Sequence, residues 1–222
     1  MRRSPVTSST PARPWERRVA LAAKRSLDVA VAFTLLVLLS PLIAVVASTI
    51  RVAMGSPVFF RQLRPGYQGR PFELIKFRTM RPPRSPAEAH TDAERMTWLG
   101  GMLRKSSLDE LPQLVNVIRG DLSLVGPRPL LMEYLPLYTH EQARRHEVRP
   151  GITGWAQVNG RNSLRWEEKF ACDLWYVQRW SFWLDLQILA RTVPRVISGG
   201  GVGSGGLPTA EVWSGNPEGC GR

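Results

Sequence analysis

The longest apolar run of the chain lies near its N-terminus, where no charged residue occurs between Asp28 and Arg51. A helix that crosses the hydrocarbon core of a bilayer needs about 20 mostly apolar residues, so the pattern predicts a membrane helix here. Ser40 and Pro41 fall at the middle of the run. Because proline removes a helical hydrogen bond and clashes with the preceding turn, we expect a break in the helix at this place.

Basic residues flank the apolar run on both sides. They are Arg17, Arg18, Lys24 and Arg25 before it, and Arg51, Arg61, Arg64 and Arg70 after it. A spanning helix usually carries its basic residues on the cytoplasmic side only. The symmetric flanks therefore favour a re-entrant helix-break-helix over residues 20–57, with both ends in the cytoplasm. A kinked spanning helix is the alternative. A cleaved signal peptide fits less well, because the run is too long and no persuasive small-residue cleavage site precedes the charged continuation.

Two strand-like runs follow the apolar segment, at 58–62 and 72–78, on either side of a turn-rich loop that reads RPGYQGRP. This pattern predicts a β-hairpin. Lys76 and Arg78 in the second run are cations that could face substrate phosphates, although a solvated or lipid-facing surface is equally compatible with Lys76. A proline-rich loop over 81–89 and a helix from about Asp92 to Leu103 are predicted next.

Residues 104–114 read RKSSLDELPQL, so two adjacent carboxylates follow two cations and two hydroxyls. Ser107 and Glu110 have the spacing of a capping box, in which each side chain accepts a hydrogen bond from a free backbone N–H. Apolar residues at helical spacing continue to Ile118. Pro112 is unfavourable inside a helix, so the helix either kinks there or begins at the proline. Either start leaves Asp109 and Glu110 at a helix entrance, where the helix dipole favours ionised carboxylates.

The C-terminal half is predicted to be mainly helical. One helical stretch runs from about Leu130 to Arg145, and we interpret His140 and His146 as surface residues. A second stretch over 166–197 is rich in aromatic residues, which either form a core or lie in a membrane interface. A glycine-rich tail over 199–222 is expected to be flexible. Its GVGSGG sequence at 201–206 belongs to no strand-turn-helix unit and is no dinucleotide-binding motif.

Composition limits the class of protein. The 222 residues suit one domain of ordinary size over 58–198, preceded by a Ser/Thr/Pro/Arg-rich, disordered basic arm over 1–19. The net charge of +12 indicates a polyanionic partner: nucleic acid, an anionic membrane or phosphorylated substrates. Cys172 and Cys220 make no disulfide framework, and no Cys/His set has zinc-site spacing, which fits a reducing cytoplasmic setting.

Three stretches of this sequence resemble the bacterial sugar transferase family, the small monotopic phosphoglycosyl transferases. They are KFRTM at 76–80, LRKSSLDELPQLVNVIRGDLSLVGPRP at 103–129 and RPGITGWAQVNGR at 149–161. The resemblance covers about residues 24–197 and corresponds to the compact catalytic unit of larger relatives. It implies a mainly α fold with a small β-hairpin, a monotopic membrane protein with a re-entrant helical hairpin and interfacial helices. The catalytic domain over 58–198 would lie on the cytoplasmic face of a bacterial inner membrane.

The resemblance also implies a reaction. A sugar-1-phosphate passes from a UDP-sugar to a polyprenol phosphate, expected to be undecaprenyl phosphate, and UMP is released. The implied course has two steps, through a covalent phosphosugar on Asp109. This would be the first membrane step in the assembly of an exopolysaccharide, capsule, O-antigen or glycoprotein. The implied partners are an anionic lipid membrane and downstream glycosyltransferases.

The residue types fit this chemistry. Asp109 can attack phosphorus as a carboxylate and form an acyl phosphate. Glu110 beside it can hold Mg²⁺, a hard cation that takes carboxylate and phosphate oxygens. The local sequence does not decide which of the two carboxylates attacks. Guanidinium groups bind phosphate through paired, charge-assisted hydrogen bonds. The candidate substrate-binding cations are Arg104, Arg128, Arg78 and Arg149.

Two other classes of function compete with this one. A membrane-anchored nucleic-acid binder would account for the basic charge, but the sequence shows no nucleic-acid-binding motif, so no nucleic-acid partner is expected. A non-catalytic scaffold of a glycan-assembly complex would keep the membrane segment and lose Asp109 or Glu110. Both residues are present, which favours the enzyme.

Overall fold

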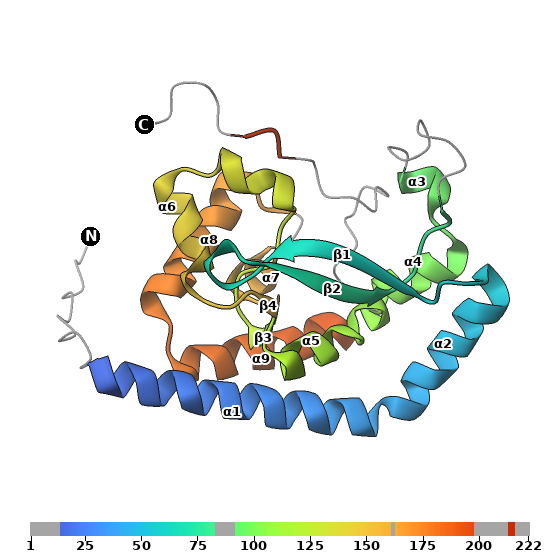
Figure 1. Cartoon of the computed structure of the whole chain (residues 1–222), viewed down its shortest axis with the longest axis horizontal. Coiled ribbons are helices and arrows are strands. Elements are labelled where there is room, and N and C mark those ends of the chain that lie inside the picture. Colours follow the sequence, from blue (N-terminus) through green and yellow to red (C-terminus); the bar gives the residue numbers. More distant parts are fainter. Residues whose placement is uncertain (1–13, 83–91, 161–162, 198–212, 216–222) are drawn as a thin grey trace.

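The computed structural model describes residues 14–82, 92–160, 163–197 and 213–215. Its first two helices, α1 (Pro14–Leu38) and α2 (Ser40–Met54), form a bent pair along one edge of the molecule (Figure 1). The two helices meet at an angle of 62°. Pro41 lies in the first turn of α2, where its missing N–H costs no helical hydrogen bond, and the hydroxyl of Ser40 donates to the carbonyl of Val37 at 2.8 Å. The predicted break at Ser40 and Pro41 is confirmed.

Among the described residues, no single helix has both the length and the apolar composition to cross a bilayer; the bent pair meets both criteria only when its helices are taken together. Residues 14–19, which the composition assigns to a disordered arm, form the first turns of α1. Large apolar side chains remain exposed on both helices: Val19, Leu21, Phe33, Leu35, Val37, Leu38, Leu42, Val45 and Val52. Apolar side chains gathered in this way are typical of an interaction surface.

β1 (Phe59–Pro65) and β2 (Pro71–Phe77) form the predicted antiparallel hairpin, which crosses the middle of the molecule (Figure 1). Phe59 pairs with Phe77 and Pro65 with Pro71, so the strands match along their whole length. Most side chains of β2 are buried, whereas most of those on β1 are exposed. β2 therefore contributes to the interior, and its Phe72 belongs to the main hydrophobic core.

The helix predicted over 92–103 is present as two pieces, α3 (Asp92–Arg95) and α4 (Trp98–Lys105). Thr97 separates them, because its hydroxyl caps α4 by accepting a hydrogen bond from a backbone N–H of the first turn at 2.9 Å. A short 3₁₀ turn, η3 (Leu108–Glu110), leads into α5 (Gln113–Arg119).

A second, parallel pair of strands joins two loops that are distant in the sequence. β3 (Ser123–Val125) lies beside β4 (Gly151–Thr153). A Cβ added to Gly126 would lie 2.3 Å from the carbonyl oxygen of Arg149, and one added to Gly154 would lie 2.1 Å from the carbonyl oxygen of Gly126. The structure shows that these glycines are needed because two backbones are in contact.

The segment predicted as one helix over 130–145 is folded as short turns. They are η4 (Met132–Leu137), α6 (His140–Ala143) and η5 (Arg144–Glu147). Pro136 lies within this segment, and a proline in a helix interior removes a backbone hydrogen bond and kinks or breaks the helix. His140 is exposed, as predicted. His146 is buried, which corrects the prediction, and its Nδ1 lies 3.3 Å from the carbonyl oxygen of Gly66.

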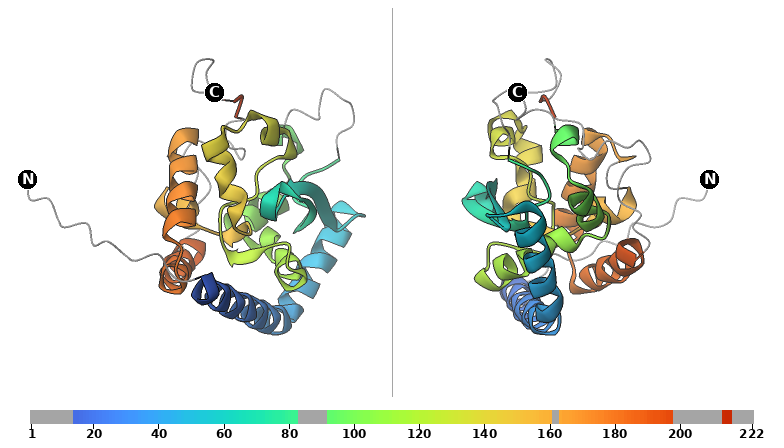
Figure 2. Two further views of the ribbon diagram at one scale, coloured as in Figure 1. Left: turned by 60° about the vertical axis from the view of Figure 1, so that its left-hand side comes forward. Right: turned by 90° about the vertical axis from the view of Figure 1, so that its right-hand side faces the viewer.

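α7 (Trp155–Asn159), α8 (Trp166–Arg179) and α9 (Phe182–Ile197) complete the fold, and the last two confirm the helical pattern predicted over 166–197. α9 lies near α1, and α8 rises from there toward α6 (Figures 1 and 2). The aromatic residues of this region differ in burial, and the core alternative holds for those packed inside. The rings of Trp155 and Trp175 stack at 4.5 Å beside the core, whereas Trp183 is 67% exposed.

Polar side chains of α1 fix this helix to the remainder of the protein. Lys24 pairs with a carboxylate on α9, Arg25 donates to carbonyls at the end of α5, and Asp28 accepts hydrogen bonds from β3. Their partners are Asp185, the carbonyls of Val117 and Ile118, and the hydroxyl of Ser123 with the N–H of Leu124. Breaking a buried, hydrogen-bonded charge pair is costly, so α1 is held firmly against the domain. The main hydrophobic core extends this contact, since it includes residues of α1, α5, α8 and α9.

An aromatic cluster lies on the side of the molecule formed by α6 and α8. Its buried members are Tyr134, Phe170 and Trp213. Of the glycine-rich tail the structure describes only residues 213–215. Trp213 is 5% exposed, so the expectation of a flexible tail does not hold at this residue. The other residues of the predicted tail lie outside the described part of the chain.

Candidate active site

The two adjacent carboxylates lie on the 3₁₀ turn η3, between α4 and α5. Pro112 is the N-cap residue of α5, so the helix starts after the proline, which is one of the two starts that the sequence left open. The predicted capping box is wrong. Ser107 has a left-handed backbone (φ 57°) and makes no capping hydrogen bond, and the Glu110 side chain binds cations instead. The turn thereby directs both carboxylates toward the protein interior, where Asp109 is 7% exposed.

Glu110 is held by two cations. Its Oε1 accepts hydrogen bonds from Nζ of Lys76 on β2 and from Nη2 of Arg128, each at 3.0 Å. Burial by itself would raise the pKa of Glu110, but the two cations outweigh burial and hold this pKa far below its usual range. Glu110 is therefore ionised at physiological pH. The Lys76 side chain is 19% exposed and belongs to the site rather than to a solvated surface.

Asp109 is shifted in the opposite direction. Burial raises the pKa of its carboxyl group, and the negative charge of Glu110 raises this pKa further. The positive charges of three residues offset part of this rise in the pKa of Asp109: Lys76, Arg104 and Arg128. No described residue donates a hydrogen bond to the Asp109 carboxylate. Asp109 is thus the less stabilised anion of the two.

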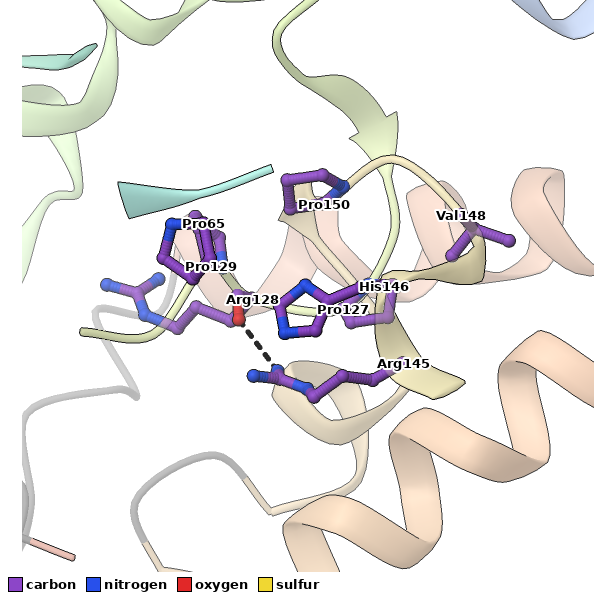
Figure 3. A pocket seen from close by; sticks show the side chains of 8 residues that line it. All are labelled: Pro65, Pro127, Arg128, Pro129, Arg145, His146, Val148 and Pro150. Carbon is purple, nitrogen blue, oxygen red and sulfur yellow. Dashed lines mark hydrogen bonds between the residues drawn. The ribbon is translucent and has the colours of Figure 1, made fainter. Parts of the chain in front are cut away.

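The loop that carries Arg128 is fixed from behind. Pro127 and Pro129 restrict the backbone on either side of Arg128. Figure 3 shows the guanidinium of Arg145 directed at the backbone carbonyl oxygen of Arg128, and the distance from Nη2 to this oxygen is 2.8 Å. Arg145 is itself paired with Asp173 of α8 at 2.6 Å, and both side chains are buried. The guanidinium of Arg128 therefore reaches Glu110 from an anchored backbone.

The Arg145–Asp173 pair has no signal in the local sequence. The two residues are 28 positions apart and come from different elements, η5 and α8. His146 beside them lines the same small pocket as Arg128 (Figure 3). Burial, and then the charge of Arg145, lower the pKa of His146 to about 4, so this ring is neutral at physiological pH. Sequence reasoning missed all three of these supporting residues.

Two of the predicted substrate-binding cations lie elsewhere. Arg78 is buried and donates hydrogen bonds to the carbonyls of residues 54–56, at the end of α2. Arg149 donates to the carbonyl of Gly120 at 3.0 Å and lies over the ring of Tyr67. Neither guanidinium is hydrogen-bonded to the two carboxylates. The structure brings together Asp109, Glu110, Arg104 and Arg128, and adds Lys76.

The donor groups of this site suit Mg²⁺ only together with a substrate. The described residues contain no cluster of three or more His, Cys, Asp or Glu side chains able to form a protein cage around a metal. Oε2 of Glu110 receives no hydrogen bond from the described residues, while Oε1 receives two. Mg²⁺ commonly takes one or two carboxylates, substrate phosphates and waters. A carboxylate with one open oxygen fits that kind of binding.

Two carboxylates lie among three cations, Lys76, Arg104 and Arg128, and this concentration of positive charge suits an anionic, phosphorylated substrate. Comparison with known proteins identifies the class. The sequence profile of the bacterial sugar transferase family matches residues 19–199. The chain belongs to the bacterial sugar transferase family, as the resemblance predicts, and it is a transferase.

The chain is similar in sequence to several named bacterial proteins. EpsL of Bacillus subtilis (strain 168), an uncharacterized sugar transferase, is 55% identical over 194 residues, which cover 87% of this chain and 96% of EpsL. A UDP-glucose:undecaprenyl-phosphate glucose-1-phosphate transferase of Caulobacter vibrioides is 42% identical over 199 residues, covering 85% of this chain and 74% of the relative. The exopolysaccharide production protein ExoY of Sinorhizobium fredii is 40% identical over 192 residues, covering 78% and 85%.

Proposed function

We propose that this protein transfers a sugar-1-phosphate from a UDP-sugar to a polyprenol phosphate, in particular undecaprenyl phosphate, and releases UMP. The observation that carries the proposal is the unequal pair Asp109 and Glu110. Glu110 is anchored by two cations, and Asp109 is buried beside it with a raised pKa. The surrounding positive charge of Lys76, Arg104 and Arg128 suits a diphosphate substrate.

In the proposed first step, the carboxylate of Asp109 attacks the phosphorus that carries the sugar. The bond from this phosphorus to the bridging oxygen breaks, UMP leaves with that oxygen, and an acyl phosphate joins the phosphosugar to Asp109. In the second step, an oxygen of the polyprenol phosphate attacks the same phosphorus, and the Asp109 carboxylate leaves. Arg104 and Arg128 stabilise negative charge on the phosphoryl oxygens in both steps.

Mg²⁺ is part of this proposal. Glu110 would hold the ion through Oε2, with phosphate oxygens of the substrate and waters as the other ligands. The bound ion would supply positive charge against the diphosphate. Lys76 and Arg128 keep Glu110 ionised and fixed through Oε1.

The proposed location is the cytoplasmic face of a bacterial inner membrane. The exposed apolar side chains of α1 and α2 support it, because they suit a helical hairpin that enters the lipid and returns. A polyprenol acceptor resides in the same membrane. Downstream glycosyltransferases, which extend the lipid-linked sugar, are proposed as functional partners.

The first donor to test is UDP-glucose, because the 42%-identical relative of Caulobacter vibrioides is named for it. Purified protein is incubated with a panel of UDP-sugars and Mg²⁺, with and without polyprenol phosphate, and UMP is measured. We expect acceptor-dependent turnover with at least one sugar. A non-catalytic scaffold, the second candidate, would release no UMP from any donor.

The covalent intermediate makes a separate prediction. Without acceptor, UMP should appear in an amount stoichiometric with the enzyme, and a phosphosugar adduct should map by mass spectrometry to the peptide that holds Asp109. Asp109→Asn keeps the shape of the side chain but removes the anionic oxygen, so it should abolish both the adduct and turnover. Near-native turnover by this variant would overturn the covalent mechanism. An adduct on Glu110 would exchange the roles of the two carboxylates.

A further inference from the structure

Trp213 fills a socket of aromatic side chains, which we call the aromatic socket: Tyr134, Tyr138, Trp166 and Phe170. Its ring centroid lies 4.9 Å from that of Phe170 and 5.4 Å from that of Tyr138, on which it stacks at 22°. The backbone N–H of Trp213 also donates to the hydroxyl of Tyr134 at 3.1 Å. Such ring contacts add stabilisation beyond the buried area. Trp213 is thus seated by several specific contacts.

The position of Trp213 is unexpected from the chain order. α9 (Phe182–Ile197) lies on the α1 side of the molecule, whereas the short described segment 213–215, dark red in Figure 1, lies on the opposite side. The family profile ends at residue 199, so Trp213 lies beyond the part shared with the family. The tail of this chain therefore contributes a contact that the family match does not account for.

Contacts lead from the socket to the active site without interruption. The hydroxyl of Tyr138 accepts a hydrogen bond from Nη1 of Arg145 at 3.2 Å. Nη2 of Arg145 donates to the carbonyl of Arg128 at 2.8 Å, and Arg128 binds Glu110 at 3.0 Å (Figure 3). Leu130 and Leu131, which follow Arg128 closely in the chain, also rest against this cluster.

We propose that Trp213 and Arg145 are positioning residues for the transferase site: Trp213 closes the aromatic socket over Tyr138 and Arg145, and Arg145 then holds Arg128 against Glu110. The physical reason is the exclusion of water. Arg145 lies 5.9 Å from the Tyr138 ring and 5.8 Å from the Phe170 ring, so removal of Trp213 would open its surroundings. Hydrogen bonds of a buried guanidinium weaken when water competes for them.

The first test is a double-mutant cycle on the full-length protein. Trp213→Ala is made in the native background and in the Arg128→Lys background, and kcat for UMP release is measured in each. Trp213→Ala should lower kcat about tenfold in the native background, within the roughly 10²-fold that a misplacement of about 1 Å can cost. It should have little further effect once Arg128 is replaced, because coupled residues are not additive. Equal losses in both backgrounds, or no loss in either, would refute the proposal.

Two further variants control this cycle. Trp213→Phe keeps an aromatic ring in the socket and should retain most of the activity, and Ser214→Ala changes the exposed neighbour of Trp213 and should behave as native. Arg145→Lys keeps the charge but replaces the three nitrogens that reach Tyr138, Arg128 and Asp173 with a single one, so it should lower kcat as Trp213→Ala does. Native activity of Arg145→Lys would contradict the role given to Arg145.

The inference rests on the proposed function. A second measurement is therefore needed that does not depend on enzyme activity. In hydrogen exchange by mass spectrometry, Trp213→Ala should raise the exchange of the peptide that holds Arg128, Leu130 and Leu131, while the peptide of the β1–β2 hairpin stays unchanged. Unchanged exchange at the Arg128 peptide would overturn the inference. If the native protein releases no UMP from any donor, the proposed function fails, and the exchange result still decides whether Trp213 positions this loop.

Discussion

At the scale of single residues, Asp109 and Glu110 are adjacent in sequence but differ in their surroundings. Lys76 and Arg128 both donate hydrogen bonds to Oε1 of Glu110, which stabilises Glu110 as an anion. Asp109 has no such hydrogen bonds from described residues, and its pKa is raised by burial and by the charge of Glu110. This difference is the reason why we propose Asp109, and not Glu110, as the nucleophile, a choice that the sequence left open.

The raised pKa predicts an acid limb in the rate of UMP release measured in a single turnover. The attacking form is the carboxylate, so the rate should fall as the pH drops through the pKa of Asp109. Lys76→Met removes a charge that lowers this pKa, so the pKa rises further and the acid limb should move to higher pH. Lys105→Met, at an exposed position nearby, is the control and should leave the profile in place. A shift to lower pH in Lys76→Met would contradict the assignment.

Metal dependence is expected at Glu110. UMP release should stop in EDTA, return with Mg²⁺ and return in part with Mn²⁺. Glu110→Gln removes the charge while it preserves size, and should reduce turnover by at least about 10²-fold, a magnitude usual for a group that stabilises developing charge. Raising the Mg²⁺ concentration should not restore this variant. Full turnover of the native protein in metal-free buffer would exclude the proposed cofactor.

At the scale of elements, the close approach of β3 and β4 predicts a contrast between two glycines. A Cβ on Gly151 would lie 2.1 Å from the backbone N of Gly126, so Gly151→Ala must push the strands apart and should destabilise the protein by about 1–3 kcal/mol or more. It should also lower activity, because the loop with Arg128 follows β3. Gly101→Ala in α4 meets no atom within 4 Å and should add about 0.5–1 kcal/mol of stability. Thermal unfolding of both variants in detergent tests the pair.

Elements with a local signal were predictable from the sequence. The β1–β2 hairpin follows from strand runs around a Gly/Pro loop, and the α1–α2 break from Ser40-Pro41. The parallel β3–β4 pair was missed, because its strands are too short to show a pattern and they pair across 28 residues, Ser123 with Gly151. The prediction of a continuous helix over 130–145 was wrong. It followed the spacing of apolar residues, and this spacing does not show that Pro136 interrupts the segment.

The residues of the site also fall into those that the sequence could predict and those that it could not. Asp109, Glu110 and Arg128 were identified from a contiguous motif that resembles a known family. Lys76 remained ambiguous, since only the folded chain shows that it pairs with Glu110. The Arg145–Asp173 pair could not be predicted, because a single sequence holds no information on which distant charges meet. Arg78 illustrates the converse: its motif suggests phosphate binding, yet the fold uses its guanidinium to bind backbone carbonyls.

At the scale of the whole molecule, the bent helix pair predicts the membrane topology. Single cysteines are placed at Arg17, before the apolar part of α1, and at the exposed Arg70 after β1, in a background without Cys172 and Cys220. In intact cells, a reagent that cannot cross the inner membrane should label neither cysteine; after this membrane is permeabilised, it should label both. Labelling of the Arg17 position from the periplasm would show a spanning helix instead. Pro41→Leu should shift the helix toward spanning, because it removes the break.

The fixed attachment of Arg128 through Arg145 to Asp173 has a consequence for the newly made chain. During synthesis Asp109 and Glu110 leave the ribosome first, and the guanidinium that pairs with Glu110 follows them. The loop that carries Arg128 is anchored only when α8 (Trp166–Arg179) has emerged and folded, because Asp173 of α8 holds Arg145. If the proposed mechanism holds, a growing chain without α8 should take up no phosphosugar, and a chain that ends at residue 165 should release no UMP. Sugar transfer would then wait until the enzyme is nearly finished.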